Sequence, residues 1–241
     1  MKIGLLALAL GSIATGALFS RGSGVHAIAS YATSLVGRTA DQRHNAVLAL
    51  LRLDGKVIPA HGEFSFNRTV GTFSRDAGFR KAPVSYNGTL ISSWGGGVCQ
   101  ASTTFYNAGL IAGLTVLERN RHRFMPSYVP PGRDAAVAFG NLDLRFRNTN
   151  NFPITIHARV EMERLQVTLT SEQEVAHSEI LTEIQSVTEP RLYLVGSGTS
   201  SRVRNSGKAG FQVATLRVTS GKVALVSVDS YPVMNRVIEF R

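Results

Sequence analysis

The single cysteine, Cys99, is the feature that most restricts how this chain can fold, because a lone thiol cannot form an intrachain disulfide. Stability must therefore come from a hydrophobic core. A chain of 241 residues with 44% hydrophobic and 17% charged residues can build such a core, as one large domain or as a medium domain plus a small one. The same composition excludes a disordered protein. The thiol is then either an inert part of the core or a reactive group.

The formal net charge of +10 comes mainly from arginines that are scattered along the chain. Charge alone does not distinguish nucleic acid, anionic lipid and a polyanionic cell wall as partners. No nucleic-acid recognition motif is present, so a nucleic-acid partner is not expected. The one cysteine and the dispersed histidines show no metal-ligand spacing. We therefore expect neither a metal nor a cofactor.

The first residues have the order of a secretory signal. Lys2 precedes an apolar run from Ile3 to Phe19, and Val25-His26-Ala27 offers a small-x-small cleavage site after Ala27. The run is also just long enough for an uncleaved membrane anchor. Residues 1–30 are therefore interpreted as a signal peptide or an N-terminal membrane anchor. The rest of the chain is expected to be extracytoplasmic, in the periplasm or cell envelope.

Hydrophobic periodicity predicts two main helices in the region that follows. The first begins at Thr39 or Asp41 and stops at Asp54-Gly55, and the second covers about residues 100–114. Asn87-Gly88 predicts a hairpin turn. Strands are expected over residues 57–59, 63–67, 83–86, 115–117, 135–139, 142–147, 154–160 and 165–170.

The C-terminal part differs in composition from the rest. Residues 171–190 are polar and acidic and are interpreted as a linker or a short helix, whereas the last 50 residues alternate apolar and polar side chains. That alternation predicts a small antiparallel β module. The expected fold class is α+β, with an antiparallel sheet packed against two main helices. Residues 31–171 form the main domain, and residues 172–241 form the linker and the all-β module.

Cys99 follows three glycines and begins an amphipathic helix. A helix start leaves backbone N–H groups unpaired and carries roughly half a positive charge, which favours a thiolate. Amides near Gly96 and Gly97 can also donate to an oxyanion. This local pattern is typical of a nucleophile site. A buried cysteine that only packs is the alternative, and the pattern leaves both open.

A thiol nucleophile requires a base and a group that orients the base. Of six histidines, His122 is the strongest candidate, although its basic cluster can also be a solvated loop. Asp134 is the nearest downstream carboxylate and could orient the imidazole, while Arg133 could hold a substrate carboxylate. The other histidines are less suitably placed. His26 lies beside the cleavage site, His44 on a helix, His61 in a turn, His157 in a strand and His177 in the linker.

Three further side chains are candidates for substrate contact. Gln100 adjoins the cysteine, although packing explains it equally well. Trp94 could stack on a substrate or close the core. Tyr128 belongs to the loop that ends at Asp134.

Several sequence blocks match a known family. They are Arg43 with Asn45, Gly62 to Asn67, Gly71, Gly95 to Thr104 with Tyr106 and Asn107, Glu118-Arg119, His122, Ser127 to Asp134, and Asp143 to Asn148. Over about residues 39–170 the chain resembles the VanW-like family. The tail, notably from Gly207 to Pro232, resembles the small G-five β module that often follows such domains.

The resemblance implies a function. Some VanW-like proteins look like unconventional L,D-transpeptidases of peptidoglycan with the family cysteine as nucleophile, which would make Cys99 the nucleophile, His122 the base and Asp134 its partner. His61 stands where the family more often has proline, so it receives no catalytic role. The resemblance also leads us to expect a chain without the large N-terminal peptidoglycan-binding module that many relatives carry.

The expected function is therefore an extracytoplasmic cysteine acyltransferase of the L,D-transpeptidase type, acting on peptidoglycan stem peptides. One alternative is a peptidoglycan hydrolase that uses the same Cys99 and His122 with water as acceptor. The other is a non-catalytic accessory protein, of the glycopeptide-resistance type, that binds peptidoglycan or its precursors. The expected partner is peptidoglycan or a precursor in each case, with possible membrane anchoring by the N-terminal segment.

Overall fold

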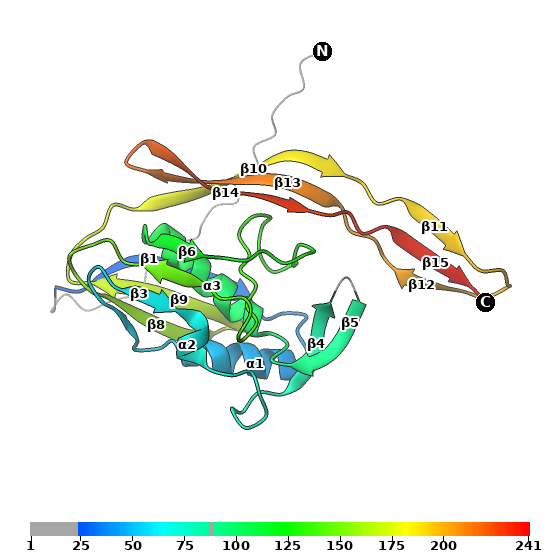
Figure 1. The fold of residues 1–241 in the computed structure, drawn as a ribbon, viewed down its shortest axis with the longest axis horizontal. Coiled ribbons are helices and arrows are strands. Elements are labelled where there is room, and N and C mark those ends of the chain that lie inside the picture. Colours follow the sequence, from blue (N-terminus) through cyan, green and yellow to red (C-terminus); the bar gives the residue numbers. More distant parts are fainter. Residues whose placement is uncertain (1–23, 87–88) are drawn as a thin grey trace, which may run out of the picture.

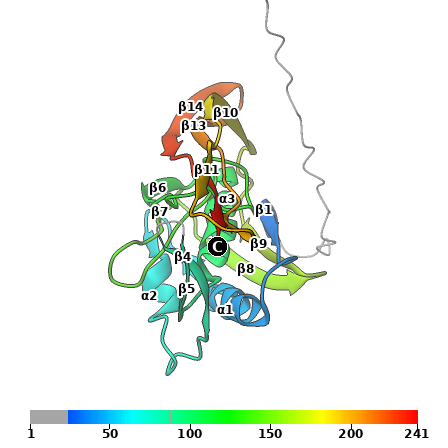
Figure 2. The ribbon, with the colours of Figure 1, turned by 90° about the vertical axis from the view of Figure 1, so that its right-hand side faces the viewer.

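The computed structural model of the protein describes residues 24–86 and 89–241 (Figures 1 and 2). The apolar run of the expected signal or anchor and the Asn87-Gly88 turn lie outside these residues. Within them, no helix is long and apolar enough to cross a membrane. Most of the strands are antiparallel, and the α+β fold class is confirmed.

The main sheet has the strand order β1-β9-β8-β2 and is antiparallel throughout. Its strands are β1 (His26–Ser34), β2 (Val57–Ile58), β8 (Ile154–Glu161) and β9 (Arg164–Ser171). In β8 apolar residues alternate with polar ones, so one face of the sheet is buried. The domain boundary expected after residue 30 lies inside β1. A cut after Ala27 would also divide this strand, since its pairing with β9 starts at residue 26.

Two long helices pack against this sheet, as the periodicity predicts. Helix α1 (Ala40–Leu51) is capped by Thr39, which forms a capping box with Gln42. Helix α3 (Val98–Ile111) is buried along nearly its whole length and contacts α1, β1 and β9. Its apolar residues include Phe105, which is fully buried. A helix with so little exposed surface is a rigid support for any residue in its first turn.

A short third helix replaces part of an expected strand. The strand predicted over 63–67 stops at Ser65, where β3 (Glu63–Ser65) ends, and α2 (Phe66–Val70) follows. The reason is local, because the Ser65 hydroxyl accepts a hydrogen bond from the Arg68 N–H at 3.1 Å and thus caps a helix. Strand β3 belongs to a small sheet with β7 (Arg145–Arg147) and β6 (Thr115–Glu118).

The expected strand at residues 135–139 is wrong. These residues make only the isolated bridges Asn120↔Ala136 and Ala138↔Leu142. Several other hydrogen bonds of this segment go to side chains of α3, because residues 135–137 run along that helix. By contrast, the hairpin expected around residues 87–88 is present as β4 (Lys81–Tyr86) and β5 (Thr89–Trp94).

The interpretation of residues 171–190 as a linker or short helix is also wrong. Most of this stretch is β10 (Ser178–Thr188), an 11-residue strand. Its pairing partner, β13 (Gly210–Thr219), lies far along the chain and pairs in turn with β14 (Lys222–Tyr231). Backbone hydrogen bonds from so distant a strand leave no short-range signal in the sequence. We call these three strands the C-terminal sheet.

The chain also forms a small sheet beyond the C-terminal sheet, from β11 (Leu192–Val195), β12 (Ser201–Asn205) and β15 (Arg236–Phe240). Figure 1 shows it as an arm that reaches away from the helices. The C-terminal sheet instead lies over α3, so that this helix is placed between it and the main sheet in both views (Figures 1 and 2). The C-terminal β strands therefore include a part that covers the domain and a part that projects from it.

Candidate active site around Cys99

Cys99 lies in the first turn of α3 and is partly exposed. The glycines before it allow close packing. A Cβ atom at Gly97, which has a φ of 110°, would lie 2.2 Å from the carbonyl oxygen of Gln42, and one at Gly96 would lie 2.8 Å from that of Ala82. The glycines thus bring the start of α3 directly against α1 and β4.

The backbone N–H groups of this turn differ in whether they already donate a hydrogen bond. The Val98 N–H donates to Gly95 O and the Gln100 N–H donates to Gly97 O, each over 3.0 Å. Within residues 24–86 and 89–241, the N–H of Cys99 donates to no backbone carbonyl oxygen outside α3. The first turn of a helix leaves such donors available to a ligand. The amide of Cys99 itself is therefore the best placed oxyanion donor of the turn.

The sulfur of Cys99 is bonded to the segment that runs along α3. In its thiol form Cys99 donates to the Val137 carbonyl oxygen over 3.4 Å, and the Val137 N–H donates to the sulfur over 3.5 Å, a bond that the thiolate also accepts. Farther along the same helix, the Ala135 N–H donates to the Thr103 hydroxyl over 3.0 Å. These bonds attach the loop to Cys99 and to Thr103, which are one helical turn apart on α3. The loop is therefore held along the helix axis.

His122 and Asp134 are held together by two hydrogen bonds. The backbone N–H of His122 and its ring Nδ1 each lie 2.6 Å from Oδ2 of Asp134. Asp134 is fully buried, and the His122 side chain is 23% exposed. His122 lies close enough to Cys99 for each group to shift the pKa of the other. The structure thus brings the three predicted residues Cys99, His122 and Asp134 together, with His122 hydrogen-bonded to Asp134 and adjacent to Cys99.

The electrostatics of this chain favour an ion pair. Burial alone would raise the pKa of the Cys99 thiol, but the hydrogen bond and charge of His122 outweigh burial and hold that pKa below the ordinary value. Burial also disfavours the imidazolium, yet Asp134 and Cys99 together raise the pKa of His122 to about 10. Despite burial, bonds to His122 and the charge of Arg119 lower the pKa of Asp134 to about 2. These shifts favour a thiolate–imidazolium pair over the neutral thiol and imidazole.

Arg119 supports Asp134 from the other side. Its Nη2 donates to Asp134 Oδ1 over 2.9 Å, and its Nε donates to the Asp134 carbonyl oxygen over 2.6 Å. Its Nη1 lies 2.6 Å from both carboxylate oxygens of Asp229, a residue of β14. Tyr231, also on β14, donates its hydroxyl to Asp134 Oδ1. The sequence reasoning assigned no role to Arg119, Asp229 or Tyr231.

Among the predicted substrate contacts, Tyr128 lies nearest the site. Burial, followed by the charge at Cys99, raises the pKa of Tyr128 well above its ordinary value. The Arg38 guanidinium lies over the Tyr128 ring, 4.9 Å from its centroid. This phenol therefore remains protonated near the sulfur.

The other predicted contacts lie elsewhere. Arg133 donates its Nε to Asn107 over 2.6 Å and lies over the ring of Tyr31. Gln100 is buried, and its amide nitrogen donates to Thr33 and to the carbonyl oxygen of Ser34. Trp94 is 38% exposed at the end of β5, with the Lys81 ammonium over its ring.

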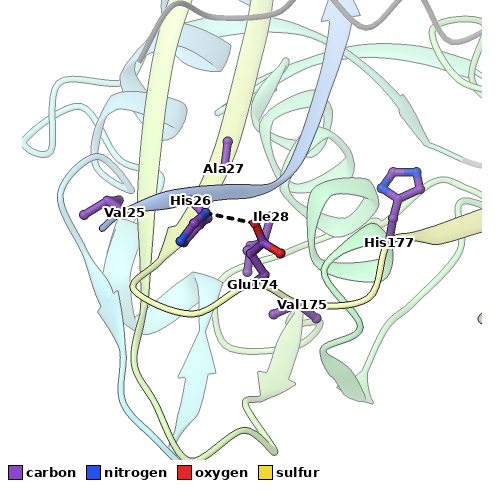
Figure 3. Close-up of a pocket in the computed structure, with 7 residues that line it drawn as sticks. All are labelled: Val25, His26, Ala27, Ile28, Glu174, Val175 and His177. Carbon is purple, nitrogen blue, oxygen red and sulfur yellow. Dashed lines mark ion pairs between the residues drawn. The ribbon is translucent and has the colours of Figure 1, made fainter. Parts of the chain in front are cut away.

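The remaining histidines do not enter the site. The ring of His44 bonds with Gly78 O, and that of His157 bonds with the Thr170 hydroxyl. A separate pocket of about 420 Å³ lies at β1. In it His26 Nδ1 lies 3.4 Å from Glu174 Oε1. His177 stands apart from this pair (Figure 3). No cluster of three or more potential metal ligands occurs in the described part of the chain.

An open depression adjoins the supporting network. It has a volume of about 580 Å³ and shares two residues with that network, Arg119 and Asp229. Its full lining is Arg119, Asn120, Arg121, Arg123, Leu142 and Asp229. Three of these six side chains are guanidinium groups, and one of the three, Arg119, is already paired with Asp229 in the same lining.

Comparison with known proteins places this site in a family. The chain is 39% identical over 132 residues to the "Uncharacterized protein YoaR" of Bacillus subtilis (strain 168), covering 55% of this chain and 44% of that protein. It is 29% identical over 170 residues to the "Vancomycin B-type resistance protein VanW" of Enterococcus faecalis (strain ATCC 700802 / V583), covering 68% of this chain and 56% of that protein. The chain spans about half the length of these curated relatives. The family model described as "VanW like protein" matches residues 41–170, more than half of the chain and all of the Cys99–His122–Asp134 site. The chain therefore belongs to the VanW-like family.

Proposed function

We propose that this protein is an extracytoplasmic cysteine acyltransferase of the L,D-transpeptidase type that acts on peptidoglycan stem peptides. The observation that carries the proposal is the placement of Cys99, at the start of a buried helix, beside a His122 ring that is hydrogen-bonded to the buried Asp134. The name of the Enterococcus faecalis relative connects the family with vancomycin resistance and hence with the cell wall. A basic chain with an exported or membrane-anchored N-terminus fits a partner in that compartment.

In the acylation step, the Cys99 thiolate attacks the carbonyl carbon of the third residue of a donor stem. A carbon–sulfur bond forms, and the carbon–nitrogen bond to the terminal D-alanine breaks. The His122 imidazolium supplies the proton that the leaving amine requires. The products are a thioester on Cys99, neutral His122 and free D-alanine.

In the second step, a side-chain amine of a neighbouring stem attacks the thioester. Neutral His122 accepts the proton that this amine loses, and the thiolate leaves as the new amide bond forms. The imidazolium and the thiolate are thereby restored. Asp134 remains ionised throughout, since it fixes the ring orientation and stabilises the imidazolium.

The tetrahedral intermediate of each step requires donors for its oxyanion. The Cys99 N–H is one, and the Tyr128 hydroxyl beside the sulfur is a second. Removal of one such donor typically costs about 10²–10³ in rate. The arginine-lined depression beside Arg119 would attract the carboxylates of a stem peptide.

The test is incubation of the purified full chain with a disaccharide-tetrapeptide, followed by mass spectrometry. Cross-linked dimer and free D-alanine from the wild type, but not from Cys99→Ala, would support the transferase. A trimmed tripeptide stem without dimer would replace it with the hydrolase. Equal products from both proteins would overturn a cysteine mechanism. Absence of any product, together with slow alkylation of Cys99 by iodoacetamide at neutral pH, would leave the non-catalytic binding protein.

A further inference from the structure

We propose that the C-terminal sheet is an integral part of the active unit, with Tyr231 and Asp229 of β14 as positioning residues that act through Asp134 and Arg119. The family match ends at residue 170, so both residues lie outside it. The proposal rests on that part of the proposed function which makes Cys99 a reactive thiolate. It adds that residues far beyond the matched domain keep the thiolate–imidazolium pair in place.

Tyr231 provides the first connection. Its hydroxyl donates to Oδ1 of Asp134 and accepts from the Gly132 N–H over 3.1 Å. Tyr231 is 2% exposed and Asp134 is not exposed at all. No water can readily replace a donor in so closed a place, so the carboxylate depends on this phenol for part of its solvation.

Asp229 provides the second connection. It accepts from Arg119 Nη1 through both oxygens at 2.6 Å and from the Ser227 hydroxyl over 2.9 Å. The same guanidinium donates to Asp134 through Nη2. Arg119 thus bridges two carboxylates, one in the matched domain and one in the C-terminal sheet. Because the side chains of Arg119 and Asp229 are only 7% and 9% exposed, solvent screens this bridge weakly.

The backbone of the loop before Asp134 is clamped to the same sheet. The Thr215 hydroxyl of β13 donates to Gly132 O over 3.1 Å. Gly132 has a φ of 79°, and a Cβ atom there would lie 2.4 Å from that hydroxyl oxygen. Nearby, Arg217 donates to Leu114 O, at the end of the α3 region, over 3.1 Å. The sheet therefore holds both the loop that carries Asp134 and the helix region behind it.

These contacts determine the orientation of the catalytic imidazole. Four donor groups converge on the Asp134 carboxylate: the His122 N–H, the His122 ring, Arg119 and the Tyr231 hydroxyl. One of them belongs to the C-terminal sheet, and a second, Arg119, is held by that sheet through Asp229. Without them the carboxylate can rotate, and the His122 ring loses its fixed position relative to the sulfur. The thiolate is then less stabilised.

The experiment measures alkylation of Cys99 by iodoacetamide as a function of pH in the full chain. Tyr231→Phe removes one hydroxyl and keeps the ring. We expect alkylation at neutral pH to slow by about two- to tenfold, the effect of one hydrogen bond, and the midpoint of the pH profile to move up toward an ordinary thiol. Tyr193→Phe is the matched control, since Tyr193 is 47% exposed in β11.

A double-mutant cycle separates positioning from a general loss of structure. In an Asp134→Asn background, Tyr231→Phe should no longer change the alkylation rate or its pH midpoint, because the group through which it acts is altered. Asp229→Asn is the second variant and should move the midpoint in the same direction. Unchanged profiles for both variants, or an equal effect of Tyr231→Phe in the two backgrounds, would overturn the inference.

The outcome also distinguishes this inference from the proposed function. A wild-type Cys99 that alkylates as slowly as an ordinary thiol would defeat the proposed function itself. A fast wild type with unaffected Tyr231→Phe and Asp229→Asn variants would defeat only the role of the C-terminal sheet.

Discussion

His122 binds Oδ2 of Asp134 twice, through its backbone N–H and through its ring Nδ1, each over 2.6 Å. An ionised carboxylate accepts hydrogen bonds and donates none, so Nδ1 must carry the hydrogen. This leaves Nε2 as the nitrogen that faces the Cys99 thiol. The second bond, from the backbone, prevents the loop from moving independently of the ring. The two bonds together hold the His122 ring in a fixed orientation.

The reactivity of Cys99 should depend on His122. In His122→Asn the imidazolium is lost while the thiol stays partly buried, so its pKa should rise. We expect alkylation by iodoacetamide at neutral pH to slow by about tenfold or more, with a midpoint moved to higher pH. His177→Asn, at an exposed histidine, is the control and should behave as the wild type. A pH profile that does not respond to His122→Asn would contradict the ion pair.

The acid stability of the fold should depend on Asp134. Its pKa falls from an ordinary 3.8 to about 2 in the folded protein. Its contribution is therefore fully present above pH 4 and is lost as the pH falls from about 4 through 2, since the unfolded state binds the proton more tightly. The loss is on the order of 2 kcal/mol. Urea unfolding of Asp134→Asn across this range should show a shallower pH dependence than the wild type. Parallel curves for the two proteins would disprove the linkage.

The buried bridge between Asp229 of β14 and Arg119 should stabilise the whole fold. Asp229→Asn removes one of the two carboxylates of Arg119 and should lower the free energy of unfolding by about 3 kcal/mol. Added salt should change this loss little, because the groups are shielded from solvent. Glu239→Gln is the control, since Glu239 pairs with Arg202 at the exposed arm. Urea titration of both variants is the measurement, and equal losses would argue against a special role for the bridge.

The glycine before α3 should not tolerate any side chain. Gly97→Ala places a Cβ atom against Gln42 O in addition to the strained φ, so α1 or α3 must shift. Gly113→Ala has a similar positive φ of 77° but meets no atom within 4 Å, so it should cost only about 1–2 kcal/mol. The unfolding free energy should fall further in Gly97→Ala, and its Cys99 alkylation rate should change. Similar stability losses in the two variants would exclude the close approach as the cause.

The elements that the sequence determined are those specified by short-range signals. Thr39 with Gln42 starts α1, and three glycines place Cys99 in the first turn of α3. Alternation of apolar residues specifies β8 and β9. Caps, turns and hydrophobic periods act within a few residues, so a single sequence displays them directly. The same local chemistry singled out Cys99 as a possible nucleophile, and His122 and Asp134 came from the surrounding motifs.

The tertiary structure decided which distant groups meet. Residues 135–139 have the composition of a strand but bond with side chains of α3, and residues 178–188 form a strand only because β13 returns to pair with them. Tyr231 reaches Asp134 across 97 positions of the chain, and Asp229 reaches Arg119 across 110. Such contacts depend on how three layers stack around α3, and no local pattern near either partner records them. Local chemistry therefore pointed to Cys99 as a candidate nucleophile, and only the packing of the sheets showed which groups hold its neighbours His122 and Asp134 in place.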